Sequence, residues 1–204
     1  MRPLFIIACL LTSVIARSAS VLVEGEAFQF KGKWVVEKSS DCLGSAMLRV
    51  YQDSRSGEAD DALTVVNIPQ AGLYRVWTRS QDYAGSLKPR TYTLSIDGKA
   101  MSESGAHGVA GFYWESVGET ELEAKTVLMR ISDTGQYFGR CDAILLTTDM
   151  SLDPNKLSNA EIARWRRNPT TMEYTTASAA HLGEPRDIVS GYATIATASN
   201  SDIR

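Results

Sequence analysis

From residue 21 to residue 148 the sequence consists of short apolar or alternating runs that end at turn residues. Ala62–Ile68 is β-branched and apolar, and a Pro-Gln-Ala-Gly sequence follows it. Leu73–Ser80 alternates in polarity, and Thr91–Ile96 alternates before the turn pair Asp97-Gly98. Short runs bounded by turn residues are typical of antiparallel strands, and Asp-Gly favours a tight hairpin.

Thr126–Ile131 and Cys141–Thr147 are two further expected strands, and no helical period of useful length interrupts this region. This spacing of strands and turns predicts an all-β fold, an antiparallel sandwich or barrel, over residues 21–150. We found no internal repeat.

The pattern of strands and turns ends after residue 150. Asp153-Pro154-Asn155 is a break, and Ser158 with Glu161 has the form of a capping box for a short helix that Pro169 ends. Residues 170–204 are rich in Thr, Ala and Ser with few apolar anchors. We therefore expect residues 151–204 to form a short helix and a mobile tail.

The first twenty residues have the pattern of a secretory signal peptide. Arg2 gives a positive start, Leu4–Ala16 is apolar but too short to span a membrane, and Ser18-Ala19-Ser20 offers a cleavage site. Cys9 lies inside the apolar run, whereas a lipoprotein cysteine ends it. The prediction is a secreted or periplasmic protein; the alternative is a buried N-terminal helix.

The charge of the chain limits its partners. The formal net charge is −3, and removal of residues 1–20 takes away two arginines and no acid. An acidic mature chain disfavours nucleic acid and anionic membranes as partners, because both attract basic patches. The sequence leaves the oligomeric state open.

The usual catalytic motifs are missing. The sequence has two histidines, His107 and His181, and it contains no Gly-x-Ser-x-Gly elbow, Cys-x-x-Cys pair or His-Glu-x-x-His helix. The glycines Gly105, Gly108 and Gly111 do not have the spacing of a phosphate-binding loop. These absences favour a non-catalytic protein.

Glu24 and Glu26 stand two residues apart, so on a strand they would point to the same side. Asp142 would join them if the last strand pairs with the first. Hard carboxylate oxygens of this kind suit a structural calcium ion. The alternative is a solvated edge strand whose charges discourage aggregation.

The mature chain keeps two cysteines, Cys42 and Cys141. In an exported protein they could form a disulfide, and the alternative is two separate buried thiols. The sequence does not decide between these two states.

Aromatic residues gather in the expected loops, at Tyr83, in Phe112-Tyr113-Trp114 and in Tyr137-Phe138. Aromatic rings bind the apolar faces of sugars, although packing accounts for many such clusters. Alternation sends Phe112 and Trp114 to one face and Tyr113 to the other. We expect Tyr83, Tyr113 and Tyr137 to contact a ligand, and Phe112 and Trp114 to pack in the core.

Several segments together resemble galactose-binding-like jelly rolls, among them carbohydrate-binding modules of the family 6 and family 35 type. They are Val23–Glu26, Ile68–Trp77, Leu94–Lys99 and Cys141–Ile144. The resemblance implies a jelly-roll β-sandwich. It also implies a calcium ion between acidic residues of the first strand and an Asp near the last, at Glu24, Glu26 and Asp142 by position.

A second resemblance is to the N-terminal module of bacterial FAD-dependent oxidoreductases found among polysaccharide-degrading enzymes. The segments that carry it are Thr78–Tyr83, Gly111–Trp114, Phe138–Ile144, Glu161–Arg167, Gly183–Val189 and Asn200–Arg204. The Gly-x-Gly-x-x-Gly loop that would seat the pyrophosphate is absent, so we expect no FAD on this chain.

The sequence therefore predicts a secreted, non-catalytic module that binds carbohydrate. One alternative is a truncated N-terminal part of an FAD-dependent oxidoreductase associated with polysaccharide degradation, and another is a partner-docking domain. The sequence names neither the glycan nor the loop that binds it.

Overall fold

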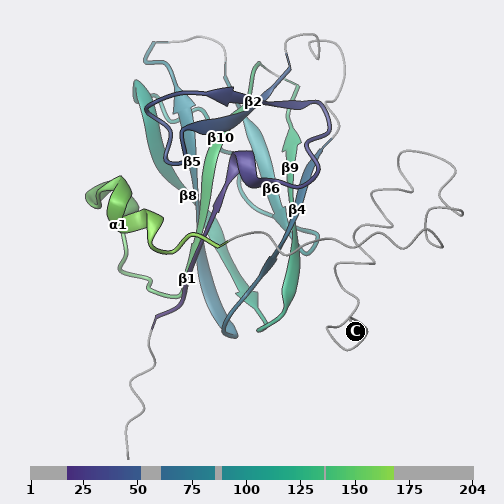
Figure 1. Ribbon diagram of the computed structural model, residues 1–204, viewed down its shortest axis with the longest axis vertical. Coiled ribbons are helices and arrows are strands. Elements are labelled where there is room, and N and C mark those ends of the chain that lie inside the picture. The colour runs from purple at the N-terminus through teal and green to yellow at the C-terminus, as the bar shows by residue number, and fades with distance from the viewer. Residues whose placement is uncertain (1–17, 52–60, 86–88, 136, 168–204) are drawn as a thin grey trace, which may run out of the picture.

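The computed structural model describes residues 18–51, 61–85, 89–135 and 137–167, which form a two-layered β-structure (Figure 1). The apolar part of the expected signal, with Cys9, lies outside the described residues, as do the expected mobile tail, Gly183–Val189 and Asn200–Arg204. In the described part, no helix is long and apolar enough to span a membrane.

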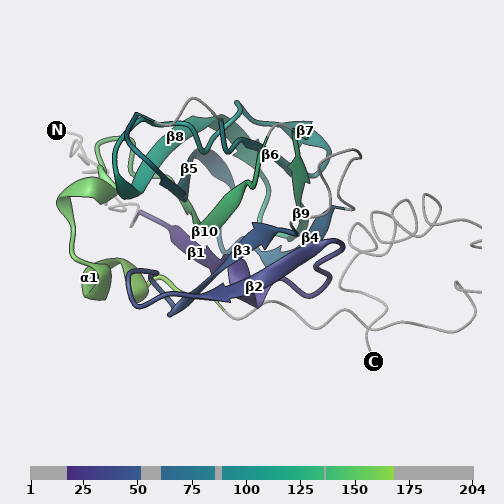
Figure 2. The same ribbon diagram turned by 90° about the horizontal axis from the view of Figure 1, so that it is seen from above.

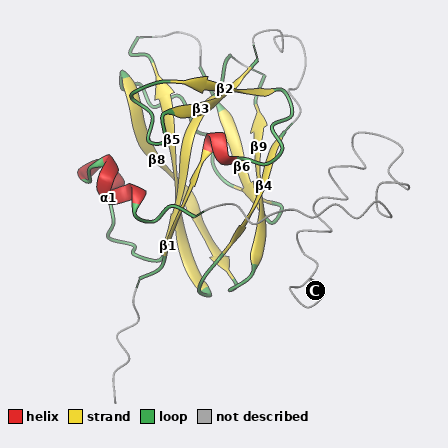
Figure 3. Cartoon of the chain, viewed as in Figure 1, coloured by secondary structure: helices red, strands yellow, loops and turns green. Residues whose placement is uncertain are grey.

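Strands dominate the described chain (Figure 3). They are β1 (Ser20–Glu24), β2 (Trp34–Lys38), β3 (Ala46–Val50), β4 (Ala62–Asn67), β5 (Gly72–Asp82), β6 (Tyr92–Ile96), β7 (Lys99–Ala100), β8 (Gly111–Leu122), β9 (Thr126–Asp133) and β10 (Arg140–Thr147). The short helical pieces are η1 (Gly25–Ala27), η3 (Pro154–Lys156) and α1 (Asn159–Ala163).

The strands form two sheets. The larger has the order β2-β3-β10-β5-β8 with β1 also paired to β10, and the smaller has the order β4-β9-β6-β7. All of these pairings are antiparallel. The predicted all-β sandwich is confirmed.

The core lies between the two sheets. Tyr74, Val76 and Ile144 of the larger sheet share one buried cluster with Tyr92 and Ile131 of the smaller. Alternation produces this arrangement, because every second side chain of each strand points inward. Burial of these large apolar side chains is the main favourable contribution to folding.

The five predicted strands are all present, with ends that differ by at most two residues from those expected. The predicted turn is also present: Asp97 has a φ of 48° and Gly98 a φ of 79°, and they join β6 to β7 in a two-residue hairpin. Positive φ at both central residues is the requirement that Asp-Gly meets. The first strand pairs with the last, β1 with β10, which is the condition under which Asp142 was expected to join Glu24 and Glu26.

The first strand begins close to the expected cleavage site. Ser20 pairs with Thr147, and the Ala19 backbone N–H donates to Thr148 Oγ1 at 2.9 Å while the Thr148 N–H donates to the Ala19 carbonyl at 2.9 Å. Residues 19 and 20 are therefore part of the sandwich in this structure.

Residues 149–167, which we call the strap, pack on the outer face of the larger sheet (Figure 2). The predicted capping box is present, since Ser158 accepts from the Glu161 N–H and the Glu161 carboxylate accepts from the Ser158 N–H. The strap buries Ile162 and packs Leu152, Leu157 and Trp165 against the sheet residues Leu22, Trp77, Trp114, Ala143 and Leu145.

The strap also covers two strand edges. The Asn155 side-chain amide accepts from the Trp114 N–H and donates to the Trp114 carbonyl, both at 3.0 Å, as a neighbouring strand would do for β8. On β1, the Leu22 N–H donates to the Trp165 carbonyl and the Arg167 N–H donates to the Leu22 carbonyl. Unpaired strand edges invite aggregation, so these bonds make the strap part of the module.

We predict that Ile162→Ala lowers the free energy of unfolding by about 2–4 kcal/mol, because it empties a buried site between strap and sheet. Lys156→Ala is the matched control in the strap, since the Lys156 side chain is 80% exposed. Urea unfolding of both variants measures the difference. Equal stability of the two variants would show that the strap does not pack on the sheet in solution.

Candidate functional site

The described parts of three connections meet at one end of the sandwich, which we call the loop end: residues 83–85 and 89–91, residues 101–110, and residues 134–135 and 137–139. They meet because β5 ends where β8 and β10 begin, with Asp82 opposite Gly111 and Ser80 opposite Cys141. In the smaller sheet, β6 begins where β9 ends, with Tyr92 opposite Asp133. The three expected ligand tyrosines lie on these connections or beside them.

Tyr83 and Tyr137 come together around one guanidinium group. The Arg90 Cζ lies 4.4 Å from the centre of the Tyr83 ring and 5.0 Å from the centre of the Tyr137 ring. The Tyr83 residue is 44% exposed. Rings at these distances from a guanidinium make cation–π contacts.

Tyr113 lies beside a different group. Its ring is 5.5 Å from that of His107, and the residue is 39% exposed. Asp82 connects this part to the other two tyrosines, because its carboxylate accepts from the Gly108 N–H at 2.8 Å and lies 3.6 Å from Arg90. The structure thus links Tyr83 and Tyr137 through Arg90 and places Tyr113 nearby on β8.

Alternation along β8 explains the exposure of Tyr113. Trp114 is buried beneath the strap, and Phe112 lies under the Arg79 guanidinium, with its ring centre 4.7 Å from Cζ. Trp114 is therefore a packing residue, as expected, although it packs against the strap and not between the sheets.

Sequence reasoning missed the arginines of the loop end. Arg140 Cζ lies 5.5 Å from the Tyr83 ring centre, and Arg49 Cζ lies 5.8 Å from the Phe138 ring centre. Burial lowers the pKa of Arg140, although the guanidinium remains charged at neutral pH. The nearest signal in the sequence was the run Tyr137-Phe138-Gly139-Arg140, which places a ring and a cation close along the chain.

The three predicted metal ligands lie on the outer side of β1 and β10. Glu26 is not on the first strand, because β1 ends at Glu24 and η1 follows. The reasoning from strand alternation is therefore wrong for Glu26. The chain turns at Gly25, where any Cβ would collide with the carbonyl oxygen of Cys141.

Two of these carboxylates form ion pairs. Arg166 of the strap donates to both oxygens of Glu24, at 2.6 and 2.8 Å. Arg79 of β5 donates to Asp142, which is fully buried and also accepts from the Leu43 N–H. A buried carboxylate requires such partners because its desolvation is costly.

Glu26 differs from the other two carboxylates. Its Oε2 is buried and has no hydrogen-bond partner among the described residues. Burial first, and then the neighbouring Glu24 and Asp142 carboxylates, raise its pKa to about 7. A Cβ on Gly44 would collide with carboxylate oxygens of Glu26 and Glu24, so the glycine leaves room for both.

The surroundings of Glu24, Glu26 and Asp142 show whether these carboxylates suit a cation. Over residues 18–51, 61–85, 89–135 and 137–167, no three acidic, His or Cys side chains have the spacing of a complete metal site. The donor chemistry nevertheless suits a hard cation, since Glu26 has an orphaned buried oxygen beside two further carboxylates. Arg79 and Arg166 supply the positive charge in this structure.

The cysteines form no disulfide. Cys42 and Cys141 are both free and buried. Burial raises the pKa of each thiol to about 12. Protonated thiols in such surroundings behave as small apolar side chains.

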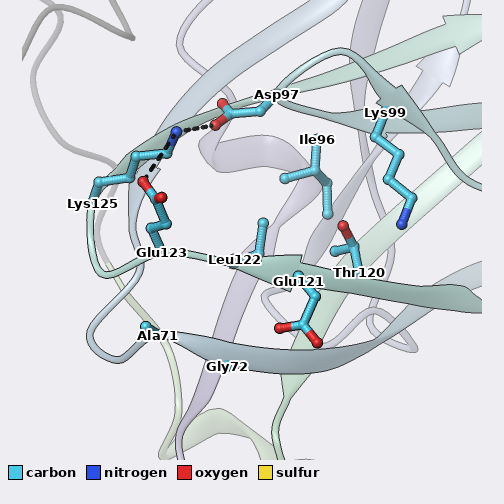
Figure 4. Close-up of a pocket in the computed structure, with 10 residues that line it drawn as sticks. All are labelled: Ala71, Gly72, Ile96, Asp97, Lys99, Thr120, Glu121, Leu122, Glu123 and Lys125. Atoms are coloured by element: carbon cyan, nitrogen blue, oxygen red, sulfur yellow. Dashed lines mark ion pairs between the residues drawn. The ribbon is translucent and has the colours of Figure 1, made fainter.

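A shallow pocket of about 530 Å³ lies at the opposite end of the sandwich, beside the start of β5 (Figure 4). Lys125 lies 3.1 Å from Asp97 and 3.9 Å from Glu123 at its rim, and Ile96 and Leu122 line it. None of the predicted site residues lines it.

Solved structures show what this arrangement of strands is similar to. The GH26-CBM35 β-(1,4)-mannanase of Podospora anserina matches with a TM-score of 0.51 and 20% identity, over 68% of this chain and 29% of that one. The CBM35 of Paenibacillus barcinonensis matches with a TM-score of 0.51 and 16% identity, over 63% of this chain and 99% of that one. The chain has the β-sandwich fold of carbohydrate-binding modules. No family model and no curated protein matches the sequence.

At identities this low the likeness shows the fold alone. The chain covers less than a third of the mannanase but nearly all of the isolated module, so the match is to the module. The resemblance to flavin-dependent oxidoreductases stays a prediction.

We predict that a chain beginning at Ala19, which lacks Cys9, has two thiols that react with a disulfide reagent in denaturant. In the native state at pH 8 both should react slowly, because burial holds them protonated and covered. A chain with no reactive thiol in denaturant would instead contain the Cys42–Cys141 bridge.

Proposed function

We propose that this protein is a non-catalytic module that binds carbohydrate at the loop end. The observation that carries the proposal is the exposed Tyr83, held with Tyr137 around Arg90 on a fold shared with carbohydrate-binding modules. Loops carried by a rigid sandwich commonly provide binding sites. The absence of catalytic motifs from the sequence is consistent with binding alone.

We predict that Tyr83→Ala and Tyr137→Ala each weaken retardation on the polysaccharide that the wild type binds, about 3–10-fold in affinity. That change in affinity corresponds to the free energy that a single aromatic contact commonly contributes. Leu73→Ala is the control, because Leu73 is also exposed but lies at the opposite end of β5. Affinity electrophoresis over a panel of polysaccharides is the measurement, and loss of binding by Leu73→Ala alone would place the site elsewhere.

Tyr113 is the third proposed contact. Because its ring lies against His107 and away from Arg90, we expect Tyr113→Ala to change which glycans bind more than it changes the strongest affinity. This residue extends the proposed surface along β8.

We further propose that Glu26, Glu24 and Asp142 bind a structural calcium ion. The support is the orphaned Oε2 of Glu26, its two carboxylate neighbours and the room left by Gly44. Calcium would be the positively charged partner of the Glu26 carboxylate. It would also connect β1 with β10 on the outer side of the larger sheet.

We predict that calcium raises the melting temperature by several degrees relative to chelator, since a ligand that binds only the folded state stabilises it by about 2.7 kcal/mol at a hundredfold excess over Kd. Glu26→Gln should abolish the difference, whereas Glu103→Gln, a matched acid outside the cluster, should keep it. Identical wild-type melting curves, with no metal by elemental analysis, would contradict the calcium proposal.

Two further readings of the sequence remain hypotheses. Export by a signal peptide would deliver the module to the secreted or periplasmic location that a polysaccharide ligand requires. Parentage in an FAD-dependent oxidoreductase depends partly on segments beyond residue 167, outside the described residues. We expect no flavin on this chain, because the glycine loop that would seat its pyrophosphate is missing from the sequence.

A further inference from the structure

We infer that the end of the strap, residues 165–167, competes with a divalent cation for the Glu24 carboxylate and leaves Glu24 when the cation binds. This inference rests on the calcium site proposed above and adds to it a coupling with the strap. Residues 165–167 are called the strap end below.

One ion pair and two backbone hydrogen bonds hold the strap end on β1 (Figure 1). Arg166 donates from Nη2 to Glu24 Oε1 at 2.6 Å and from Nε to Glu24 Oε2 at 2.8 Å. On either side of Arg166, the Leu22 N–H donates to the Trp165 carbonyl at 2.9 Å and the Arg167 N–H donates to the Leu22 carbonyl at 3.0 Å. The ion pair therefore lies between the two backbone bonds, and departure of Arg166 from Glu24 would weaken both of them.

Arg166 and a cation would use the same oxygen of Glu24. A Cβ on Gly44 would collide with Glu26 Oε1 and with Glu24 Oε1, so both oxygens face the same small space beside this glycine. Glu24 Oε1 is also the oxygen that lies 2.6 Å from Arg166 Nη2. A cation held by Glu24 and Glu26 in that space would therefore repel the Arg166 guanidinium at close range.

The charges of the cluster also favour exchange of Arg166 for the cation. Glu24, Glu26 and Asp142 carry three negative charges when ionised, as metal ligands must be, and Arg79 and Arg166 carry two positive charges. A divalent cation added to all five side chains would leave one positive charge in excess. The same cation would balance the three carboxylates together with a single guanidinium. Binding is therefore more favourable when one arginine leaves.

Arg166 is the arginine that can leave. Its side chain is 42% exposed, and among the described residues its guanidinium donates hydrogen bonds to Glu24 alone. The Arg79 side chain is 11% exposed, donates to the Asp41 carbonyl at 3.2 Å and pairs with the fully buried Asp142. Separation of an exposed ion pair costs little free energy, whereas separation of a buried one leaves a charge uncompensated.

The rest of the strap has contacts that do not involve Glu24. Ile162 is buried in the apolar cluster on the outer face of the larger sheet, and Asn155 bonds to both backbone groups of Trp114. Because these contacts do not depend on the carboxylates, we expect the strap to stay on the sheet when its end is released. The release would then uncover the edge of β1 at Leu22.

The first test measures calcium binding to the wild type, Arg166→Gln and Arg164→Gln by isothermal titration. Coupling is reciprocal, so a strap end that the cation displaces must weaken cation binding in return, and we expect Arg166→Gln to bind calcium about 5-fold or more tightly than the wild type. Arg164→Gln is the matched control, because it also removes one positive charge. Arg164 lies over the Trp165 ring and forms no ion pair among the described residues.

The second test compares hydrogen exchange of the wild type in calcium and in chelator. The amides of Leu22 and Arg167 should exchange several-fold faster in calcium, because release of the strap end breaks the bonds that they donate. The Trp114 amide, which donates to Asn155, should not change and is the internal control. This measurement decides alone if Arg166→Gln does not fold.

The results separate this inference from the calcium site on which it rests. Calcium binding by Arg166→Gln but not by the wild type would support the inference, because the strap end would then outcompete the cation. Equal affinity of the two proteins, or unchanged or slower exchange at Leu22 and Arg167 in calcium, would reject the competition and keep the calcium site. Failure of both proteins to bind calcium would reject both.

Discussion

The antiparallel pairing of β10 with β1, β3 and β5 is the constraint on which the rest of the molecule depends. Every residue of β10 after Arg140 is buried. At the register shift between Cys141 and Ala143, two successive residues lie on the outer face: Asp142 lies beside Arg79 and Leu43, and Ala143 packs beneath the strap. One strand thus links the loop end, the carboxylate cluster and the surface beneath the strap.

The buried charges show how this strand is kept in place. Asp142 is 0% exposed, and removal of one partner from such a pair commonly costs 3–5 kcal/mol because the other charge is left uncompensated. Arg79 therefore secures Asp142, and the same guanidinium covers Phe112 on β8. Arg166 does the same for Glu24, so the strap contributes charge compensation as well as apolar contact. The outer face of the larger sheet is consequently a second packed layer, although a smaller one than the core.

Local patterns in the sequence predicted the strands and the helix that depend mainly on contacts between residues close together in the chain. Alternation and turn residues located β4, β5, β6, β9 and β10, and the capping box located α1. Strands β2, β3 and β8 escaped prediction; β8 has a bulge opposite Val76 and Trp77 that breaks its alternation. Glu26 was misplaced because Gly25 turns the chain for a tertiary reason, the close approach of the Cys141 carbonyl. Arg90 was missed because its contacts with Tyr83 and Tyr137 join separate loops, which no short sequence pattern records.

The structure gives Tyr83 and Tyr137 a role that the sequence did not indicate, because arginines contact their rings. A tyrosine in a loop suggests a flat platform for a sugar, since the ring is large, rigid and amphipathic. Once Arg90 lies between two of these rings and Arg140 lies over one, the rings also act as supports that fix the direction of charged donors. The loop end is therefore held together by the arginines as much as by the aromatic residues that contact them.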